Sequence, residues 1–300
     1  MRIIKLKAVL TGSINDNLRR LGYSATLRAR LRKKLGLIRI NEESKIITDF
    51  IKEGEWFEIV LEDSEIRHIK PYSFPIEFIY EDEDIAIINK PAGIAVINTR
   101  NHYGKSLENA LAAVWGDFVY RPVNRLDKDT TGLMIIAKNQ LAHSVLSKNE
   151  IQKKYLALCE GHLQGEGTID KKIARSKDSI MLREISNNGQ VAITKYKVIQ
   201  NYSTYCLVEL ELKTGRTHQI RVHMSSIDHP LLMDGLYNKN AKEYEILDSG
   251  YKLTTQALHS YYLKFAHPIS GKQMEFVNYP EYIKWAKKGL CFSFNWLYLF

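Results

Sequence analysis

The chain has few cysteines, no long hydrophobic run and one long stretch without acidic residues. Its three cysteines, Cys159, Cys206 and Cys291, form no Cys-x-x-Cys pair, which argues against a zinc ribbon or a disulfide framework and favours a reducing compartment. No apolar run approaches the roughly 20 residues that a membrane-spanning helix needs, so a soluble, cytoplasmic protein is expected. Residues 290–300 are almost wholly apolar and predict a packed terminal strand or a dimer contact, although we expect a monomer.

The composition describes a folded, basic protein. Three hundred residues with 45% hydrophobic side chains can bury one large core or two unequal ones. Lysine and arginine outnumber aspartate and glutamate by 43 to 34, which gives a net charge of +9. Such a balance favours a polyanionic partner, and nucleic acid is the leading candidate.

The stretch between Asp16 and Glu42 lacks acidic residues but holds eight basic ones: Arg19, Arg20, Arg28, Arg30, Arg32, Lys33, Lys34 and Arg39. A helix is predicted from Ser24 as N-cap to Gly36 as C-terminal stop, with an apolar stripe of Leu27, Leu31 and Leu35. Cations on its outer face are suited to phosphates, whose neutralisation releases counterions. We assign Arg28, Arg32 and Lys33 to such contacts; a merely solvated face is the alternative.

The pattern changes along the chain in a way that predicts two units. Short strands at 37–41 and 56–61 complete a small basic unit over residues 1–70, and Pro71 and Pro75 mark the linker. Over residues 71–300, strands at 133–137, 154–159, 192–199 and 205–212 mix with helices at 106–115, 140–149 and 217–227. Because no regular βαβ repeat appears, an α+β body with a mainly antiparallel sheet is expected.

Asp127 is the first candidate for a reactive group. It lies in a polar turn, followed by the apolar run at 133–137, which is a setting that fixes a carboxylate while leaving it open to substrate. Arg125 could hold this acid ionised, because an opposite charge within a few ångström lowers a carboxylate pKa by roughly 1 to 3 units. The alternative is an acidic turn that merely joins two strands.

A second cluster, LKTGRTHQIRVHM at 212–224, places Arg216 in a turn and Arg221 on a helix. Two guanidinium groups at a strand-to-helix junction could clamp a carboxylate or a phosphate; a surface salt-bridge pair is the alternative. His218 and His223 are spaced i, i+5, which points them apart on a helix and argues against a zinc site.

Tyr155 follows a basic pair in a short apolar strand, where it can stack on a base and use its hydroxyl in proton transfer. Most of the 17 tyrosines must instead be packing residues, and His259 in LHSYYLKFAHP is expected to be a core histidine.

The order NKPAG, RLDKDTTGL, KKYLAL, GRTHQIRVH and LHSYYLKFAHP, across roughly residues 76 to 280, resembles the RluA-type pseudouridine synthases. The resemblance implies the pseudouridine synthase fold, a mixed, mainly antiparallel sheet with a central cleft, and conversion of uridine in RNA, with ribosomal RNA favoured and transfer RNA possible. It implies Asp127 as catalytic aspartate, Tyr155 as the tyrosine that stacks on the base, and Arg221 as the aspartate's ion-pair partner.

The resemblance also bears on the flanking residues. Arg125, Arg216 and Asn124 are expected to contact substrate, although the family usually has histidine at the position of Asn124. The basic N-terminal unit resembles a small RNA-binding module found in a ribosomal protein and in tyrosyl-tRNA synthetases. No cofactor and no metal are expected.

Two alternatives belong to other classes. A haloacid-dehalogenase-type phosphohydrolase carries Asp-x-Asp-x-Thr, which is present at 127–131, but it needs an apolar strand before the first aspartate. Here the segment before Asp127 is broken by Arg121, Pro122 and Arg125. A non-catalytic RNA-binding protein with the same fold is the second alternative.

Overall fold

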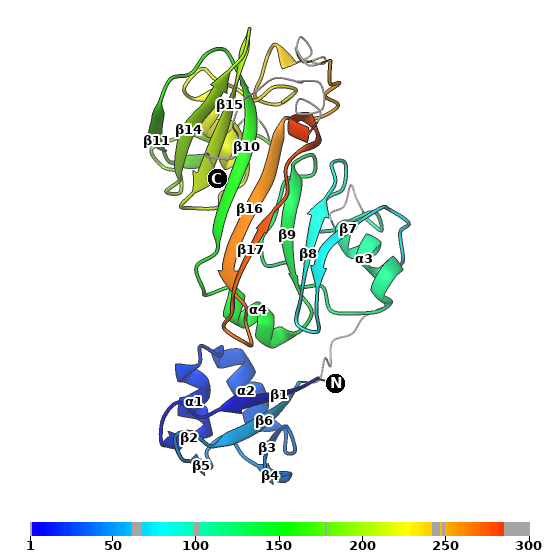
Figure 1. Ribbon diagram of the computed structural model, residues 1–300, viewed down its shortest axis with the longest axis vertical. Coiled ribbons are helices and arrows are strands. Elements are labelled where there is room, and N and C mark those ends of the chain that lie inside the picture. Colours follow the sequence, from blue (N-terminus) through cyan, green and yellow to red (C-terminus); the bar gives the residue numbers. More distant parts are fainter. Residues whose placement is uncertain are drawn as a thin grey trace.

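The computed structural model describes residues 2–61, 68–98, 103–177, 179, 181–241, 247 and 250–284. These residues form a small unit at the N-terminus and a larger unit built on a long, twisted sheet (Figure 1). The apolar tail 290–300 and Cys291 lie outside the described residues. Among those that are described, no helix is long and apolar enough to cross a membrane.

The small unit is a four-stranded antiparallel sheet covered by two helices (Figure 1). Its strands follow the order β1 (Arg2–Lys7), β6 (Trp56–Leu61), β3 (Ile38–Ile40) and β4 (Glu43–Lys45), and a separate pair joins β2 (Gly12–Ser13) to β5 (Phe50–Ile51). Helices α1 (Ile14–Arg20) and α2 (Ala25–Lys33) bury an apolar face against this sheet; the core includes Ile14, Leu18, Leu27, Leu31, Phe57 and Ile59.

Helix α2 begins where its sequence predicts and ends earlier. The Ser24 hydroxyl accepts a hydrogen bond from the Leu27 amide, so the predicted N-cap is confirmed. Lys34 already has extended backbone, and Leu35 is therefore 76% exposed instead of continuing the apolar stripe. Helix α1 was not foreseen; its buried Asn17 binds the backbone of Val9 and Leu10.

The large sheet is mixed and mainly antiparallel, which confirms the expected α+β class. Its order is β11-β14-β15-β10-β16-β9-β8-β7, and β17 also pairs with β16. The strands are β7 (Glu77–Glu81), β8 (Ile85–Lys90), β9 (Thr131–Ala137), β10 (Gln152–Glu160), β11 (Glu166–Asp170), β14 (Ile193–Asn201), β15 (Tyr205–Leu212), β16 (Leu258–Ala266) and β17 (Gln273–Val277).

Three helices and one hairpin accompany the large sheet. They are α3 (Leu107–Trp115), α4 (Gln140–Leu146), α5 (Gln219–Ser225), and the hairpin of β12 (Ile173–Arg175) with β13 (Arg183–Ile185). The predicted strands 56–61 and 205–212 are observed over the same residues, and the other predicted strands differ by one or two residues at one or both ends. Helix α5 is shorter than its predicted range, 217–227, because His218 has left-handed backbone with φ 57°.

The two halves of the large sheet meet where β16 runs parallel to β9. This ladder has only two residue pairs, His259 with Thr131 and Ser260 with Gly132. Gly132 has φ +110°, and a Cβ atom there would lie 2.3 Å from the carbonyl oxygen of Ser260. A glycine is therefore required for β9 to approach β16. The turn that carries Asp127 directly precedes this junction.

The small unit packs against helix α4 of the large unit (Figure 1). Leu141 and Val145 of α4 belong to the small unit's apolar core. Three hydrogen bonds flank this contact: the Ser24 amide donates to the Ser144 hydroxyl, Arg30 to Gln140, and Lys148 to the Gly22 carbonyl. The small unit is thus docked on the large one through both apolar and polar contacts.

Replacing Gly132 by alanine should destabilise the fold at the β9–β16 junction. The left-handed backbone alone costs about 1 to 2 kcal/mol for a residue with a side chain, and the overlap with Ser260 adds to it. Gly36→Ala is the matched control, because Gly36 has φ +81° but nothing within 4 Å. Denaturant unfolding should show that Gly132→Ala lowers the free energy of unfolding by at least about 2 kcal/mol more than Gly36→Ala does. Equal losses would contradict the steric role of the junction.

Candidate active site

A cavity of about 1170 Å³ opens beside Asp127 in the large unit. It exceeds the roughly 300 to 1,000 Å³ of most small-molecule sites, which suits a nucleotide with part of its backbone. Its wall includes Asp127, Tyr155 and six basic side chains, Arg125, Lys128, Lys153, Lys213, Arg216 and Lys264, against the further acids Glu150 and Glu211. This excess of positive charge favours a polyanionic ligand.

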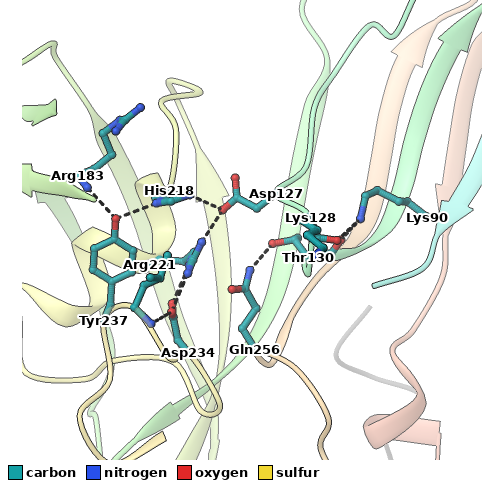
Figure 2. A network of polar contacts seen from close by, with 11 residues as sticks. Lys90, Asp127, Lys128, Thr130, Arg183, His218, Arg221, Asp234, Tyr237 and Gln256 are labelled. Atoms are coloured by element: carbon teal, nitrogen blue, oxygen red, sulfur yellow. Dashed lines mark hydrogen bonds and ion pairs between the residues drawn. The ribbon is translucent and has the colours of Figure 1, made fainter. Parts of the chain in front are cut away.

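The turn that carries Asp127 is held from behind by Lys90, the lysine of NKPAG at the end of β8. The buried ammonium donates hydrogen bonds to the carbonyl oxygens of Lys128 (2.8 Å), Thr130 (2.9 Å) and Pro91 (2.9 Å), and Figure 2 shows the first two. Burial lowers the pKa of Lys90 to about 7, and the charges of Asp129 and Asp127 act against that shift. The backbone of the Asp127 turn is therefore fixed by a group that itself makes no contact with the cavity.

Arg221 of α5 joins Asp127 to a second carboxylate (Figure 2). Its Nε and Nη2 donate to the two oxygens of Asp234, each at 2.7 Å, and its Nη1 donates to Asp127 Oδ2 at 3.1 Å. The Asp234 side chain is fully buried, whereas that of Asp127 is 26% exposed. Arg221 is thus anchored on Asp234 and presents its remaining donor to the acid that faces the cavity.

His218 lies on the other side of the same carboxylate oxygen. Its Nε2 is 3.8 Å from Asp127 Oδ2, and its Nδ1 is 2.8 Å from the Tyr237 hydroxyl. The Tyr237 ring also packs under the Arg221 guanidinium, with 5.0 Å between the guanidinium carbon and the ring centroid. Burial lowers the pKa of His218, although Asp127 acts in the opposite direction. A neutral imidazole is the form that this surrounding favours.

Tyr155 is buried in β10 and lines the cavity together with Asp127. Burial raises its pKa above the ordinary value, and the negative charge of Asp127 acts in the same direction. The side chain is therefore a neutral phenol at physiological pH. It offers an uncharged aromatic ring at the wall that Asp127 also lines.

The other residues predicted near Asp127 occupy different positions. Arg125 is exposed on the cavity wall, and no ion pair among the described residues joins it to Asp127; that partner is Arg221. Arg216 is also exposed on this wall, with Nε bound to the Val191 carbonyl. Asn124 lines the cavity but is buried. Its side-chain oxygen accepts a hydrogen bond from the Ile135 amide at 2.8 Å, which ties the turn to β9.

The residues predicted to contact phosphate lie on α2, outside this cavity. Arg32 and Lys33 are exposed. Arg28 is half-buried, and its Nη1 donates to the Asn15 side chain at 3.1 Å, which links α2 to α1. Arg28 therefore has a structural contact within the small unit.

The remaining histidines that the sequence singled out have structural contacts. His223 is buried between the Thr194 hydroxyl and the Lys171 carbonyl, away from His218. His259 is a core histidine, as predicted; burial lowers its pKa to about 4, and it binds Thr131 and Asn278.

One group of possible metal ligands occurs among the described residues, Asp82, Asp84 and His267. Asp84 immediately precedes β8, at the opposite end of that strand from Lys90 and the Asp127 turn. Its members already bind protein groups: His267 Nε2 contacts Asp82 at 3.0 Å, and Asp84 accepts from Asn139. This group is separate from the cavity and takes no part in the site.

Sequence reasoning missed four residues that shape this site: Lys90, His218, Asp234 and Tyr237. Lys90 and His218 stand inside motifs that were noted, but nothing in the pattern showed that the lysine is buried or that the histidine has left-handed backbone. Asp234 and Tyr237 lie in a loop without periodicity, and only the folded chain brings them to Arg221.

Comparison with known proteins identifies the family in which this site occurs. A sequence model of the family described as RNA pseudouridylate synthase matches residues 84–226, which include Asp127, Tyr155 and Arg221. The chain is 39% identical to ribosomal large subunit pseudouridine synthase D of Zymomonas mobilis over 70% of both chains. It is 35% identical to the uncharacterized RNA pseudouridine synthase YjbO of Bacillus subtilis, over 85% of this chain and 91% of that protein. The chain belongs to the RNA pseudouridylate synthase family.

A solved structure supports the family's fold. Human RNA pseudouridylate synthase domain containing 1 matches with a TM-score of 0.56 and 24% identity, over 70% of this chain and 86% of that one. The pseudouridine synthase fold predicted from the motifs is confirmed.

Family membership also decides between the classes considered from the sequence. The chain is an RNA pseudouridine synthase, an isomerase that converts uridine in RNA to pseudouridine. The phosphohydrolase alternative is not supported, and in the structure the apolar strand β9 follows the Asp127 turn instead of preceding it.

Replacing Lys90 by methionine should destabilise the Asp127 turn, because three carbonyl groups, of which that of Thr130 is buried, lose their donor. The effect should depend on pH. The folded pKa, about 7, lies below the ordinary value of 10.5, so the unfolded chain binds a proton that the folded chain has released. The free energy of unfolding should therefore rise from pH 7 towards pH 10 in the wild type relative to Lys90→Met. Denaturant unfolding at several pH values measures this; a pH-independent difference would contradict the shift.

Proposed function

We propose that the chain isomerises uridines of ribosomal RNA, with Asp127 as the reacting group, Tyr155 as the base-stacking residue and Arg221 as the partner of the aspartate. The observation that carries the assignment of Asp127 is its position: it is the acid at the cavity wall that is also paired with a buried, anchored arginine. The ribosomal target is supported by relatives named ribosomal large subunit pseudouridine synthase D.

The reaction requires a small set of groups, and the cavity offers them. The bond between N1 and C1′ must break, the uracil must turn, and a bond from C5 to C1′ must form, while C5 loses a proton and N1 gains one. An ionised Asp127 can attack the sugar or remove a proton from C2′, and either route leaves the displaced base negatively charged. The reaction is internally balanced, because base and sugar are both retained and no electrons are exchanged.

Tyr155 and the basic wall are suited to hold that displaced base. The neutral Tyr155 ring provides a stacking face beside Asp127, and such stacking contributes about 1 to 3 kcal/mol per base. Arg125, Arg216 and Lys153 line the same cavity and can contact the flanking phosphates. These contacts offset the few kcal/mol needed to flip a paired uridine out of its stack.

The small N-terminal unit is proposed to bind RNA outside the cavity. This proposal is supported by the stretch between Asp16 and Glu42, which lacks acidic residues and in which Arg32 and Lys33 of α2 are exposed. Because the unit is docked on α4, its phosphate contacts have a fixed position relative to the cavity. The division at residue 70, a monomeric state and action in the cytoplasm stay predictions.

Replacing Asp127 by asparagine should abolish pseudouridine formation while leaving the fold intact, because Arg221 keeps both hydrogen bonds to Asp234. The test is to map pseudouridine in total RNA from a strain that lacks this gene, complemented with the wild-type or the variant chain. Specific sites in large-subunit ribosomal RNA should return only with the wild type. Asp129→Asn, in the same turn, is the matched control and should restore them.

Two outcomes would contradict the proposal separately. Turnover by purified Asp127→Asn would remove Asp127 from the mechanism. Sites that disappear only from transfer RNA would leave the mechanism intact and overturn the ribosomal target.

Replacing both Arg32 and Lys33 by alanine should weaken RNA binding without changing the chemical step. If each neutralises one phosphate, the slope of log K against log salt should fall by about 1.4 to 1.8, depending on whether the RNA is single-stranded or duplex. Binding titrations at several salt concentrations measure the slope, and single-turnover rates at saturating protein measure the chemistry. Lys52→Ala with Lys239→Ala, both exposed and outside α2, is the control pair. An unchanged slope would mean that the α2 face is only solvated.

A further inference from the structure

Tyr237 contacts both of the basic groups that face Asp127. Its hydroxyl is 2.8 Å from His218 Nδ1, and its ring packs under the Arg221 guanidinium (Figure 2). The backbone amide of Arg183, in β13, donates to the same hydroxyl at 2.9 Å. Among the described residues, Asp127 is the other side chain that is paired with both His218 and Arg221.

The Tyr237 hydroxyl and the Asp127 carboxylate together indicate where the imidazole of His218 carries its proton. The Arg183 amide can only donate, so the hydroxyl oxygen accepts from it, and the hydroxyl hydrogen can be donated to His218 Nδ1. The reverse arrangement, with Nδ1–H donating to the hydroxyl, would turn the Nε2 lone pair towards the Asp127 carboxylate. Burial raises the pKa of Tyr237, which keeps that hydrogen in place. With Nδ1 as an acceptor, neutral His218 bears its proton on Nε2, the nitrogen that faces Asp127.

The backbone at His218 is built to hold this orientation. His218 has left-handed backbone, with φ 57° and ψ 19°, directly before α5. A residue with a side chain adopts this conformation at a cost, and it persists only where the surroundings maintain it. Next to it, buried Gln219 binds the Ile193 carbonyl, the Thr194 hydroxyl and the Arg216 amide. The start of α5 is therefore fixed on β14.

We propose that Tyr237 is a positioning residue that keeps His218 neutral, with its Nε2–H directed at Asp127 Oδ2. His218 and Arg221 then both face Oδ2, and Oδ1 is the oxygen left to react with the ribose. This inference rests on the proposed function of Asp127 and adds to it the identity of the reacting oxygen and the protonation state of its neighbour.

A neutral His218 matters because Asp127 already has one full positive charge beside it. An imidazolium in place of the imidazole would set a second cation against the same oxygen and make the carboxylate a weaker nucleophile and base. Besides Asp127 and Tyr237, the charged groups that face His218 are Arg221 on α5, Arg183 on β13 and Asp234 in the loop after α5. The two arginines favour the neutral ring, and the two carboxylates favour the charged one.

The test is the pH dependence of the single-turnover rate for Tyr237→Phe, measured with saturating protein on RNA. The phenyl ring can still pack under Arg221, but Nδ1 loses its donor. Neutral His218 is then less favoured and its pKa rises. A rise of about one unit lowers the rate about tenfold on the acidic side of the profile and leaves the alkaline plateau unchanged. Tyr80→Phe removes a hydroxyl bound to Asp82, and neither residue lines the cavity, so this variant should leave the profile unchanged.

His218→Gln provides a second variant, because glutamine offers an N–H donor without titrating. It should keep measurable activity and lose the part of the acidic limb that His218 causes. His218→Leu offers no donor and should be slower than His218→Gln across the whole pH range.

Nitrogen NMR of the histidine rings tests the tautomer without any activity measurement. The His218 signal, identified by its absence in His218→Gln, should show the proton on Nε2 and an unprotonated Nδ1. A proton on Nδ1, or an equal loss of rate at all pH values in Tyr237→Phe, would overturn the inference. Failure of the wild type to form pseudouridine would overturn the proposed function instead, and the NMR result would still stand.

Discussion

The site depends on how one buried arginine is neutralised. Arg221 lies between a fully buried carboxylate, Asp234, and a partly exposed one, Asp127. A buried guanidinium without a partner would be strongly destabilising, and the two-pronged contact with Asp234 removes that cost whether or not Asp127 is engaged. Asp127 is therefore not needed to neutralise the arginine. It can leave the ion pair or form a bond during a reaction while Arg221 stays in place.

The contacts behind the Asp127 turn likewise leave the Asp127 side chain free of a structural role. Lys90 holds the backbone of the turn through carbonyl oxygens and leaves the Asp127 side chain to Arg221 and His218. Backbone and side chain of the turn are thus fixed by different elements, β8 on one side and α5 on the other. Rigid support of this kind reduces the reorganisation that a charged transition state would otherwise require.

The sequence predicted the parts of this site that local order determines. Asp127 and Arg221 were identified from motifs, and the fold class from the lack of a βαβ repeat. Leu35 was wrongly predicted to lie on the apolar face of α2. The helix ends at Lys33 because the backbone of Lys34 is extended, and the spacing of apolar residues does not predict where the backbone changes in this way. His218 was assumed to lie within a helix, although it precedes α5 and has left-handed backbone. Lys90 could not be foreseen as an internal support, because lysine is among the residues that proteins bury least.

The two-residue parallel ladder between β9 and β16 has a consequence for how activity is lost. Asp127 belongs to the half-sheet of β7, β8 and β9, whereas Arg221 and Tyr155 belong to the half that contains β10, β14 and β15. Backbone hydrogen bonds across the β9–β16 junction are few, so the halves are joined by packing of apolar side chains and by side-chain hydrogen bonds such as those of Thr131 with His259 and of Gln256 with Thr130. A slight parting of the junction would separate Asp127 from its partners while every strand ladder on either side stayed closed. Activity is thus lost at smaller displacements of the two halves than secondary structure is.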